Sequence, residues 1–154
     1  MRDVLKKSAV MSDQRSLMIS ALKDCFVPEL RRLGFTGSFP HFQRRLSQRV
    51  DFLTVQFNRD GGSFVVEIAK CGPNGKLEGF GSELPVSRLN VQFFSDRLRL
   101  GSDREAGRTD HWFVFGPRMC DPTEPAKPAS FYESVAKSVV PFLQAQAEGW
   151  WNAA

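Results

Sequence analysis

The chain has 154 residues, 42% of them hydrophobic and 25% charged, so it can bury a substantial core as one domain and its composition does not indicate disorder. Its formal net charge of +4 is too small to indicate nucleic-acid binding by itself. The three cysteines show no C-x-x-C pattern, and no apolar stretch has the length of a signal peptide or a membrane span. We therefore expect a cytoplasmic protein with reduced thiols and no membrane association.

The first part of the chain predicts a short leader followed by a helix. Residues 1–11 carry little pattern and are expected to form a flexible leader, with residues 12–154 as a single domain. Apolar residues then recur at helical spacing up to Gly34, which supplies a left-handed stop. Pro28 should kink or split this helix. The expected buried stripe comprises Met18, Leu22, Phe26, Leu30 and Leu33.

A β-hairpin is the clearest pattern in the sequence. Apolar residues alternate with others over Phe52–Asn58 and again over Phe64–Lys70, and Arg59-Asp60-Gly61-Gly62 supplies the turn between them. Alternation of this kind places one face of an antiparallel sheet on the core and leaves the other face comparatively polar. The residues expected to be buried against the helices are Phe57, Val66 and Ile68.

Further strands are expected on both sides of the hairpin. Phe39–Leu46 predicts the first strand of the sheet, and His111–Phe115 predicts the last. Another strand is expected around residues 89–93, where Leu89, Val91 and Phe93 alternate. A bulge near Ser95-Asp96 should follow, because the apolar phase shifts there.

The C-terminal part predicts a second long helix. Prolines at 117, 122, 125 and 128 favour an extended connector, and Ser130-Phe131-Tyr132-Glu133 then has the form of a capping box. Pro141 should bend the helix. Trp150 and Trp151 are costly to expose, so they either close the core, which we favour, or lie in an interface. The expected buried stripe comprises Phe131, Val135, Val139 and Phe142.

This order of elements predicts an α+β fold, a four- or five-stranded antiparallel meander with an N-terminal and a C-terminal helix packed on one face. Together with Leu33-Gly34-Phe35, Arg97-Leu98 and Asp110-His111-Trp112-Phe113, it resembles an uncharacterised bacterial family of domains of unknown function, numbered four-three-zero-four. The resemblance runs from about Asp13 to Glu148. It implies a cytoplasmic bacterial α+β domain, and it implies no activity and no functional residues.

Candidates for catalysis and metal binding are few. His41 and His111 are the only histidines, and so the only side chains whose ordinary pKa suits acid–base chemistry near neutrality. Asp110 precedes His111, but neighbours on a strand point to opposite faces, which favours a structural role for this histidine. A metal site of His41, His111, Asp110 and Cys120 has no supporting ligand spacing. We expect no metal, no cofactor and no catalytic residue.

An arginine-rich stretch is the candidate for nucleic-acid binding. No carboxylate occurs between Glu29 and Asp51, and the arginines near His41 and Phe42 resemble a phosphate-binding surface with stacking groups. A solvated helix end together with an exposed strand face explains the same pattern, and we favour that explanation. The arginines are Arg31, Arg32, Arg44, Arg45 and Arg49.

A second candidate surface follows from strand alternation. If Leu98 points to the core, Arg97 and Arg99 point away from it, and if Phe113 points inward, Trp112 points outward. If the strands that contain these residues are paired, Trp112 lies within reach of an arginine and forms a cation–π contact suited to an anionic ligand or an acidic partner. The alternative is that Trp112 packs under the connection of residues 101–110.

The sequence as a whole favours a non-catalytic binding or protein-interaction module of the bacterial cytoplasm that uses the uncovered sheet face, with Arg97, Arg99 and Trp112 as its binding residues. The first alternative is a nucleic-acid-binding domain that uses Arg44 and Arg45. The second alternative is a small enzyme with a site near His111.

Overall fold

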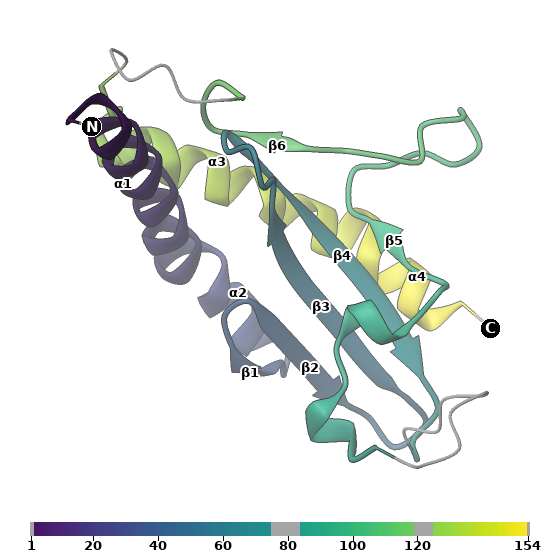
Figure 1. Cartoon of the computed structure of the whole chain (residues 1–154). Helices are drawn as coiled ribbons and strands as arrows, with labels where there is room; N and C mark the ends of the chain where they lie inside the picture. The colour runs from purple at the N-terminus through teal and green to yellow at the C-terminus, as the bar shows by residue number, and fades with distance from the viewer. Residues whose placement is uncertain (1, 75–83, 119–124, 154) are drawn as a thin grey trace.

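The computed structural model describes residues 2–74, 84–118 and 125–153, with side chains from residue 14 onward. The fold is α+β, as the sequence predicted: an antiparallel sheet with an N-terminal and a C-terminal helix packed on one face (Figure 1). These helices are α1 (Arg2–Cys25) and α3 (Ala129–Phe142). They pack against each other and share one hydrophobic core with the sheet.

In the described residues the sheet has six strands, and two of them, β5 and β6, pair with the same edge of β4. The order runs β1-β2-β3-β4, and β5 and β6 both pair with β4, at Glu67–Ile68 and at Ser63–Phe64 respectively. Because β3 occupies the other side of β4, the two short strands follow each other along one sheet edge. The bounds are β1 (Thr36–Ser38), β2 (His41–Arg45), β3 (Val50–Phe57), β4 (Ser63–Cys71), β5 (Leu98–Arg99) and β6 (Phe113–Val114).

The predicted hairpin is confirmed as β3 and β4. Their register runs from Val50 opposite Cys71 to Phe57 opposite Phe64, and Gly61 and Gly62 close the turn with positive φ of 85° and 82°. Val66 and Ile68 are fully buried against the helices, as expected. Phe57 is only half-buried, because it lies at the open end of β3.

The other face of the sheet is not left polar, which corrects the prediction of an uncovered face. Phe52 and Ala69 are buried there in a second cluster beneath Leu89 and Val91. Val65 and Glu67 are also buried on this side, so only the margins of the face are open. In a strand that is buried on both faces, apolar and polar residues no longer alternate strictly, and the prediction rested on that alternation.

The covering segment is helical, where the sequence predicted a strand around residues 89–93. It contains η1 (Val86–Arg88) and η2 (Val91–Phe93), two short 3-10 helices. The Asn90 side chain accepts a hydrogen bond from the Gln92 N–H, which caps η2 and ends the extended backbone. The predicted bulge near Ser95-Asp96 is also wrong, because β5 begins only at Leu98.

The N-terminal helix divides near Pro28, as expected. α1 ends at Cys25 and α2 (Val27–Arg32) follows it, and Gly34 then adopts a positive φ of 94°. Residues 2–11, which the sequence assigned to a leader, lie within α1. Leu33 is 36% exposed and does not belong to the buried stripe. No helix in the described part of the chain is long and apolar enough to cross a membrane.

The C-terminal helix begins at a different residue from the one predicted, and a different set of its side chains is buried. Its N-cap is Pro128, so Ser130 lies inside α3 and the predicted capping box does not form. α3 continues without a break into the π-helical turn η3 (Leu143–Ala147) and then α4 (Glu148–Asn152). Phe131, Val135 and Phe142 lie only at the margin of the core. The buried stripe is Tyr132, Ala136, Val139, Leu143, Ala147 and Trp151.

Candidate functional site

The outward residues of β5 and β6 meet at one sheet edge. Leu98 and Phe113 are buried, so their neighbours Arg99 and Trp112 project from the other face. The Arg99 guanidinium carbon lies 5.3 Å from the centroid of the Trp112 ring, so the predicted cation–π contact is present, although β5 and β6 each pair with β4 and not with each other. We define the Trp112 surface as the surface formed by Arg97, Arg99, Asp110, Trp112 and Val114.

Two carboxylates fix this surface and balance its charge. Glu67, only 4% exposed, accepts a hydrogen bond from Arg99 Nε at 3.0 Å and lies 3.3 Å from Arg97 Nη1. Asp110 pairs with Arg99 Nη1 and accepts a hydrogen bond from Trp112 Nε1 at 2.9 Å. The indole ring is therefore held in position before any ligand binds. Since two arginines face two carboxylates, the surface carries little free positive charge for an anion.

The pKa of Asp110 reflects this arrangement. Partial burial alone would raise the pKa, but hydrogen bonds from Arg99 and Trp112 outweigh it and hold the pKa below the ordinary range of an aspartate. Hydrogen bonds to Asp110 and Glu67 likewise outweigh burial and raise the pKa of Arg99. The ion pair of Arg99 and Asp110 therefore stays charged at neutral pH.

The end of the surface at β6 is open. Val114 is 64% exposed, and a groove of about 280 Å³ lies beside it, lined in part by Asn58, Gly62 and Arg118. The Phe115 N–H donates to the Gly62 carbonyl oxygen at 2.8 Å, so the alternation of the ladder turns the backbone N–H and C=O of Val114 away from β4. In the described residues β6 pairs only with β4, which leaves this edge unpaired.

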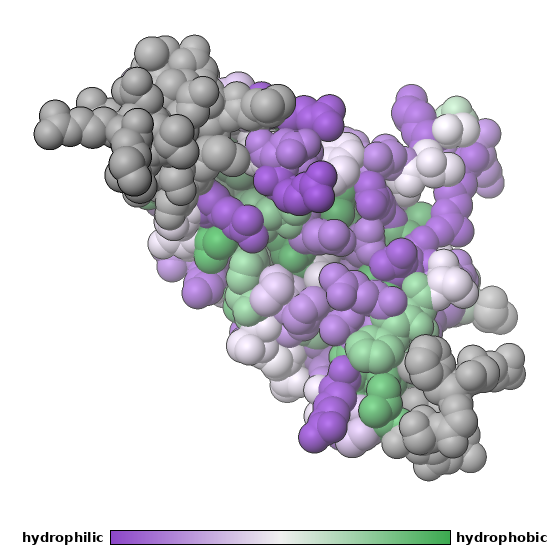
Figure 2. Space-filling view, viewed as in Figure 1, coloured by the Kyte–Doolittle hydropathy of each residue, from purple (hydrophilic) through white to green (hydrophobic). Residues whose placement is uncertain are grey.

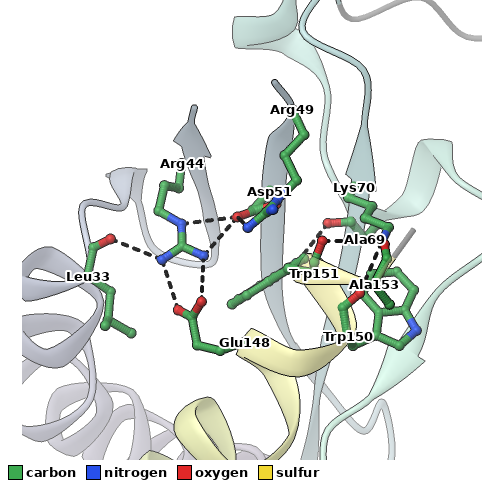
Figure 3. Close-up of polar contacts among 10 residues, drawn as sticks. All are labelled: Leu33, Arg44, Arg49, Asp51, Ala69, Lys70, Glu148, Trp150, Trp151 and Ala153. Carbon is green, nitrogen blue, oxygen red and sulfur yellow. Dashed lines mark hydrogen bonds and ion pairs between the residues drawn. The ribbon is translucent and has the colours of Figure 1, made fainter. Parts of the chain in front are cut away.

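Arg44, a predicted binding residue, is committed to contacts within the chain (Figure 3). It is buried, and its five N–H groups donate to Leu33, Asp51 and Glu148. Its guanidinium carbon lies 4.8 Å from the Phe35 ring centroid and 5.1 Å from that of Trp151. No donor of Arg44 remains for a phosphate group.

The other arginines of the stretch do not form one basic patch with it. Arg45 lies on the opposite face of β2, where it is exposed and donates to Gln43. Arg31 donates to the backbone carbonyls of Phe35 and Gly37, and so closes the turn after α2. The remaining two pair with carboxylates: Arg32 with Glu29 and Arg49 with Asp51.

The network around Arg44 contains residues that the sequence did not single out. Asp51 is fully buried between Arg44 and Arg49, and Glu148 at the start of α4 takes the other side of Arg44. Lys70 donates to the carbonyls of Trp150 and Trp151 at 3.0 and 3.2 Å, at the end of α4. Together these contacts attach the C-terminal helix to the sheet, which is a structural role.

The two histidines do not form a catalytic or metal site together. His111 packs against the rings of Phe113 and Phe142, and its own ring lies where a side chain on Gly101 would be. The Asp110 carboxylate is engaged by Arg99 and Trp112 instead. Cys120, the fourth member of the predicted ligand set, lies outside the described residues. Within the described ranges no three histidine, cysteine or acidic side chains are grouped to hold a metal ion.

The free energy of unfolding should depend on pH through His41. Burial lowers the pKa of His41 below 6.5, so the unfolded chain takes up this proton first as the pH falls. The free energy of unfolding should therefore decrease as the pH falls through about 6.5, and the loss should level off below the folded pKa. Urea unfolding at several pH values, compared between the native chain and His41→Gln, measures this contribution. Equal pH dependence in both chains would contradict it.

Fold and site together define a two-layer α+β domain with a mixed aromatic and charged surface at one sheet edge. Residues 26–145 match the family described as Domain of unknown function (DUF4304), and the chain belongs to this family. No curated protein and no solved structure matches the chain.

Proposed function

We propose that the chain is a non-catalytic protein-interaction module whose partner docks on the Trp112 surface. The observation that carries this proposal is an exposed valine, Val114, beside an indole ring that Arg99 and Asp110 already hold in place. Tryptophan and arginine are over-represented among the residues that dominate binding energy at interfaces. A side chain that is fixed before binding also loses little conformational entropy on binding.

The geometry favours an extended segment as the part of the partner that binds. The unpaired edge of β6 offers the backbone N–H and C=O of Val114 to an added strand. The adjacent groove of about 280 Å³ is small for a drug-sized ligand and accommodates an apolar side chain of such a segment. Because the charges of the Trp112 surface are balanced, apolar contact and strand pairing supply the affinity.

We propose that this module acts in the bacterial cytoplasm. Cys25 and Cys71, the cysteines in the described part of the chain, are both free, which suits a reducing compartment. The bacterial source rests on the resemblance to a bacterial family.

Substitutions at the Trp112 surface should abolish partner capture without unfolding the chain. Val114→Arg places a charge at an exposed position, and Trp112→Ala removes the central ring. Each should reduce capture of a specific partner from bacterial cytoplasm by at least about tenfold, with little change in melting temperature. Lys137→Ala, at an exposed position on α3, is the matched control and should capture as the native chain does. Undiminished capture by both surface variants would exclude this surface as the docking site.

A further inference from the structure

A second open region, apart from the Trp112 surface, lies at the β2 side of β3, where β2 is shorter than β3. His41, the first residue of β2, pairs with Thr54, so residues 55–57 of β3 extend beyond it. The Val55 N–H donates to the Pro40 carbonyl oxygen at 3.0 Å, and no strand continues from there. Arg15 and Ile19 of helix α1 line the resulting notch. The notch encloses about 410 Å³, a volume within the range of small-molecule sites.

The floor of the notch is apolar and partly aromatic. Phe39 and Phe57 lie on it with ring centroids 6.4 Å apart and planes inclined by 60°, and Pro40 and Ile19 complete it. Figure 2 shows hydrophobic surface between α1 and the sheet, with hydrophilic side chains around it. A flat apolar group fits such a floor, because aromatic rings prefer tilted or offset contacts at this spacing.

Two cations of α1 lie at the notch: Arg15 lines it, and Lys23 lies beside it, near the ring of Phe39. Arg15 and Lys23 lie two helical turns apart on one face of α1, on either side of Ile19. The Arg15 guanidinium carbon is 4.9 Å from the centroid of Phe57, and Lys23 Nζ is 6.0 Å from that of Phe39. Neither cation forms an ion pair within the described residues, unlike Arg44, which pairs with two carboxylates. Their charge is available to an anion.

Hydrogen-bonding groups also line the notch. His41 Nδ1 lies 2.9 Å from the Thr54 hydroxyl, and in the tautomer in which this hydroxyl donates to Nδ1, Nε2 carries the hydrogen and can donate to a ligand. The Asn58 N–H donates to Ser63, so the alternation of the ladder turns the Phe57 N–H away from β4 and toward the notch. These groups suit a ligand oxygen.

We infer that this notch binds a small aromatic carboxylate, with the ring against Phe39 and Phe57, the carboxylate paired with Arg15, and Lys23 adding positive charge nearby. A charge-assisted contact to a guanidinium is the strongest hydrogen bond such an anion can form here. The notch opens beside β2, and the Trp112 surface lies along the far edge of β4. The inference is therefore independent of the proposed docking function.

Titration of the isotope-labelled full chain with benzoate tests this inference by nuclear magnetic resonance. The amide signals of His41, Gln56 and Phe57 should shift and saturate with a dissociation constant of about 1 mM. Benzyl alcohol, which has the ring without the charge, should bind at least about tenfold more weakly. The double variant Arg15→Ala/Lys23→Ala should weaken benzoate binding by a similar factor, and Lys137→Ala should leave it unchanged.

Three results would overturn the inference. The first is the absence of saturable shifts at the notch with benzoate. The second is equal affinity for benzoate and benzyl alcohol, which would mean that the cations do not select a carboxylate. The third is unchanged benzoate affinity in the double variant. Arg15 is exposed and Lys23 lies on the open side of α1, so the double variant should remain folded, and its amide spectrum verifies this directly.

Discussion

Replacing Asp51 with Ala is expected to lower the free energy of unfolding by about 3–5 kcal/mol. Asp51 is 0% exposed and accepts hydrogen bonds from both Arg44 and Arg49. Its removal leaves Arg49 without its carboxylate and takes from Arg44 the acceptor of two N–H groups. A buried charge that loses its partner lowers the free energy of unfolding by more than the intact ion pair added to it.

Urea unfolding measures this effect, and an exposed aspartate provides the control. Asp60 pairs with Arg118 at 3.4 Å on the surface, so Asp60→Ala should cost less than about 1 kcal/mol. A loss below about 1 kcal/mol in Asp51→Ala as well would mean that the buried network does not hold the C-terminal helix on the sheet.

Replacing Trp151 with Ala should cost a comparable amount, about 3–5 kcal/mol. Trp151 is 1% exposed, and its ring centroid lies 5.2 Å from that of Phe35. Its Nε1 donates to the Ala69 carbonyl oxygen at 3.1 Å. The substitution therefore opens a cavity at the end of the core and removes a buried hydrogen bond.

The adjacent indole gives the matched comparison. Trp150 is only half-buried, and Lys70 Nζ lies over its ring at 5.2 Å from the centroid, so Trp150→Ala should lower the free energy of unfolding clearly less than Trp151→Ala. Equal losses in the two variants, measured by urea unfolding, would contradict the assignment of Trp151 alone to the closed core.

The parts of the fold that depend on local chemistry could be predicted. Gly61 and Gly62 adopt the backbone conformation that their turn requires, and Pro28 divides the first helix because it interrupts the helical hydrogen bonds. The outward positions of Arg99 and Trp112 also followed from local alternation, although their contact depends on the pairing of both strands with β4. Such signals lie within a few residues of the feature that they determine.

The cover over the outer sheet face depends on distant residues and could not be predicted. Leu89 and Val91 alternate as they would in a strand, but their burial is determined by Phe52 and Ala69 on the sheet beneath them. The apolar residues Val65 and Ala69 in the supposedly polar phase of β4 are the signal that both faces are covered.

The candidate sites could not be predicted fully because several arginines form ion pairs with carboxylates that are distant in the sequence. Arg44 and Glu148 are distant in the sequence, so their contact is invisible before the helix is placed on the sheet. Glu67 and Asp110 likewise compensate Arg97 and Arg99, which the alternation alone left as a free basic patch. An arginine count predicts a basic surface only where no carboxylate reaches the same guanidinium groups.

The central claim, that a protein partner docks on the Trp112 surface, is tested most directly by crosslinking from position 114. A photoreactive amino acid that replaces Val114 in the full chain, expressed in a bacterial cell, should give a discrete crosslinked species with one partner protein. The yield should fall at least about tenfold when Trp112→Ala is added, and the same photoreactive group in place of Lys137 should give no such species. Crosslinking from position 114 that equals the Lys137 control, or that does not depend on Trp112, would contradict the proposed function.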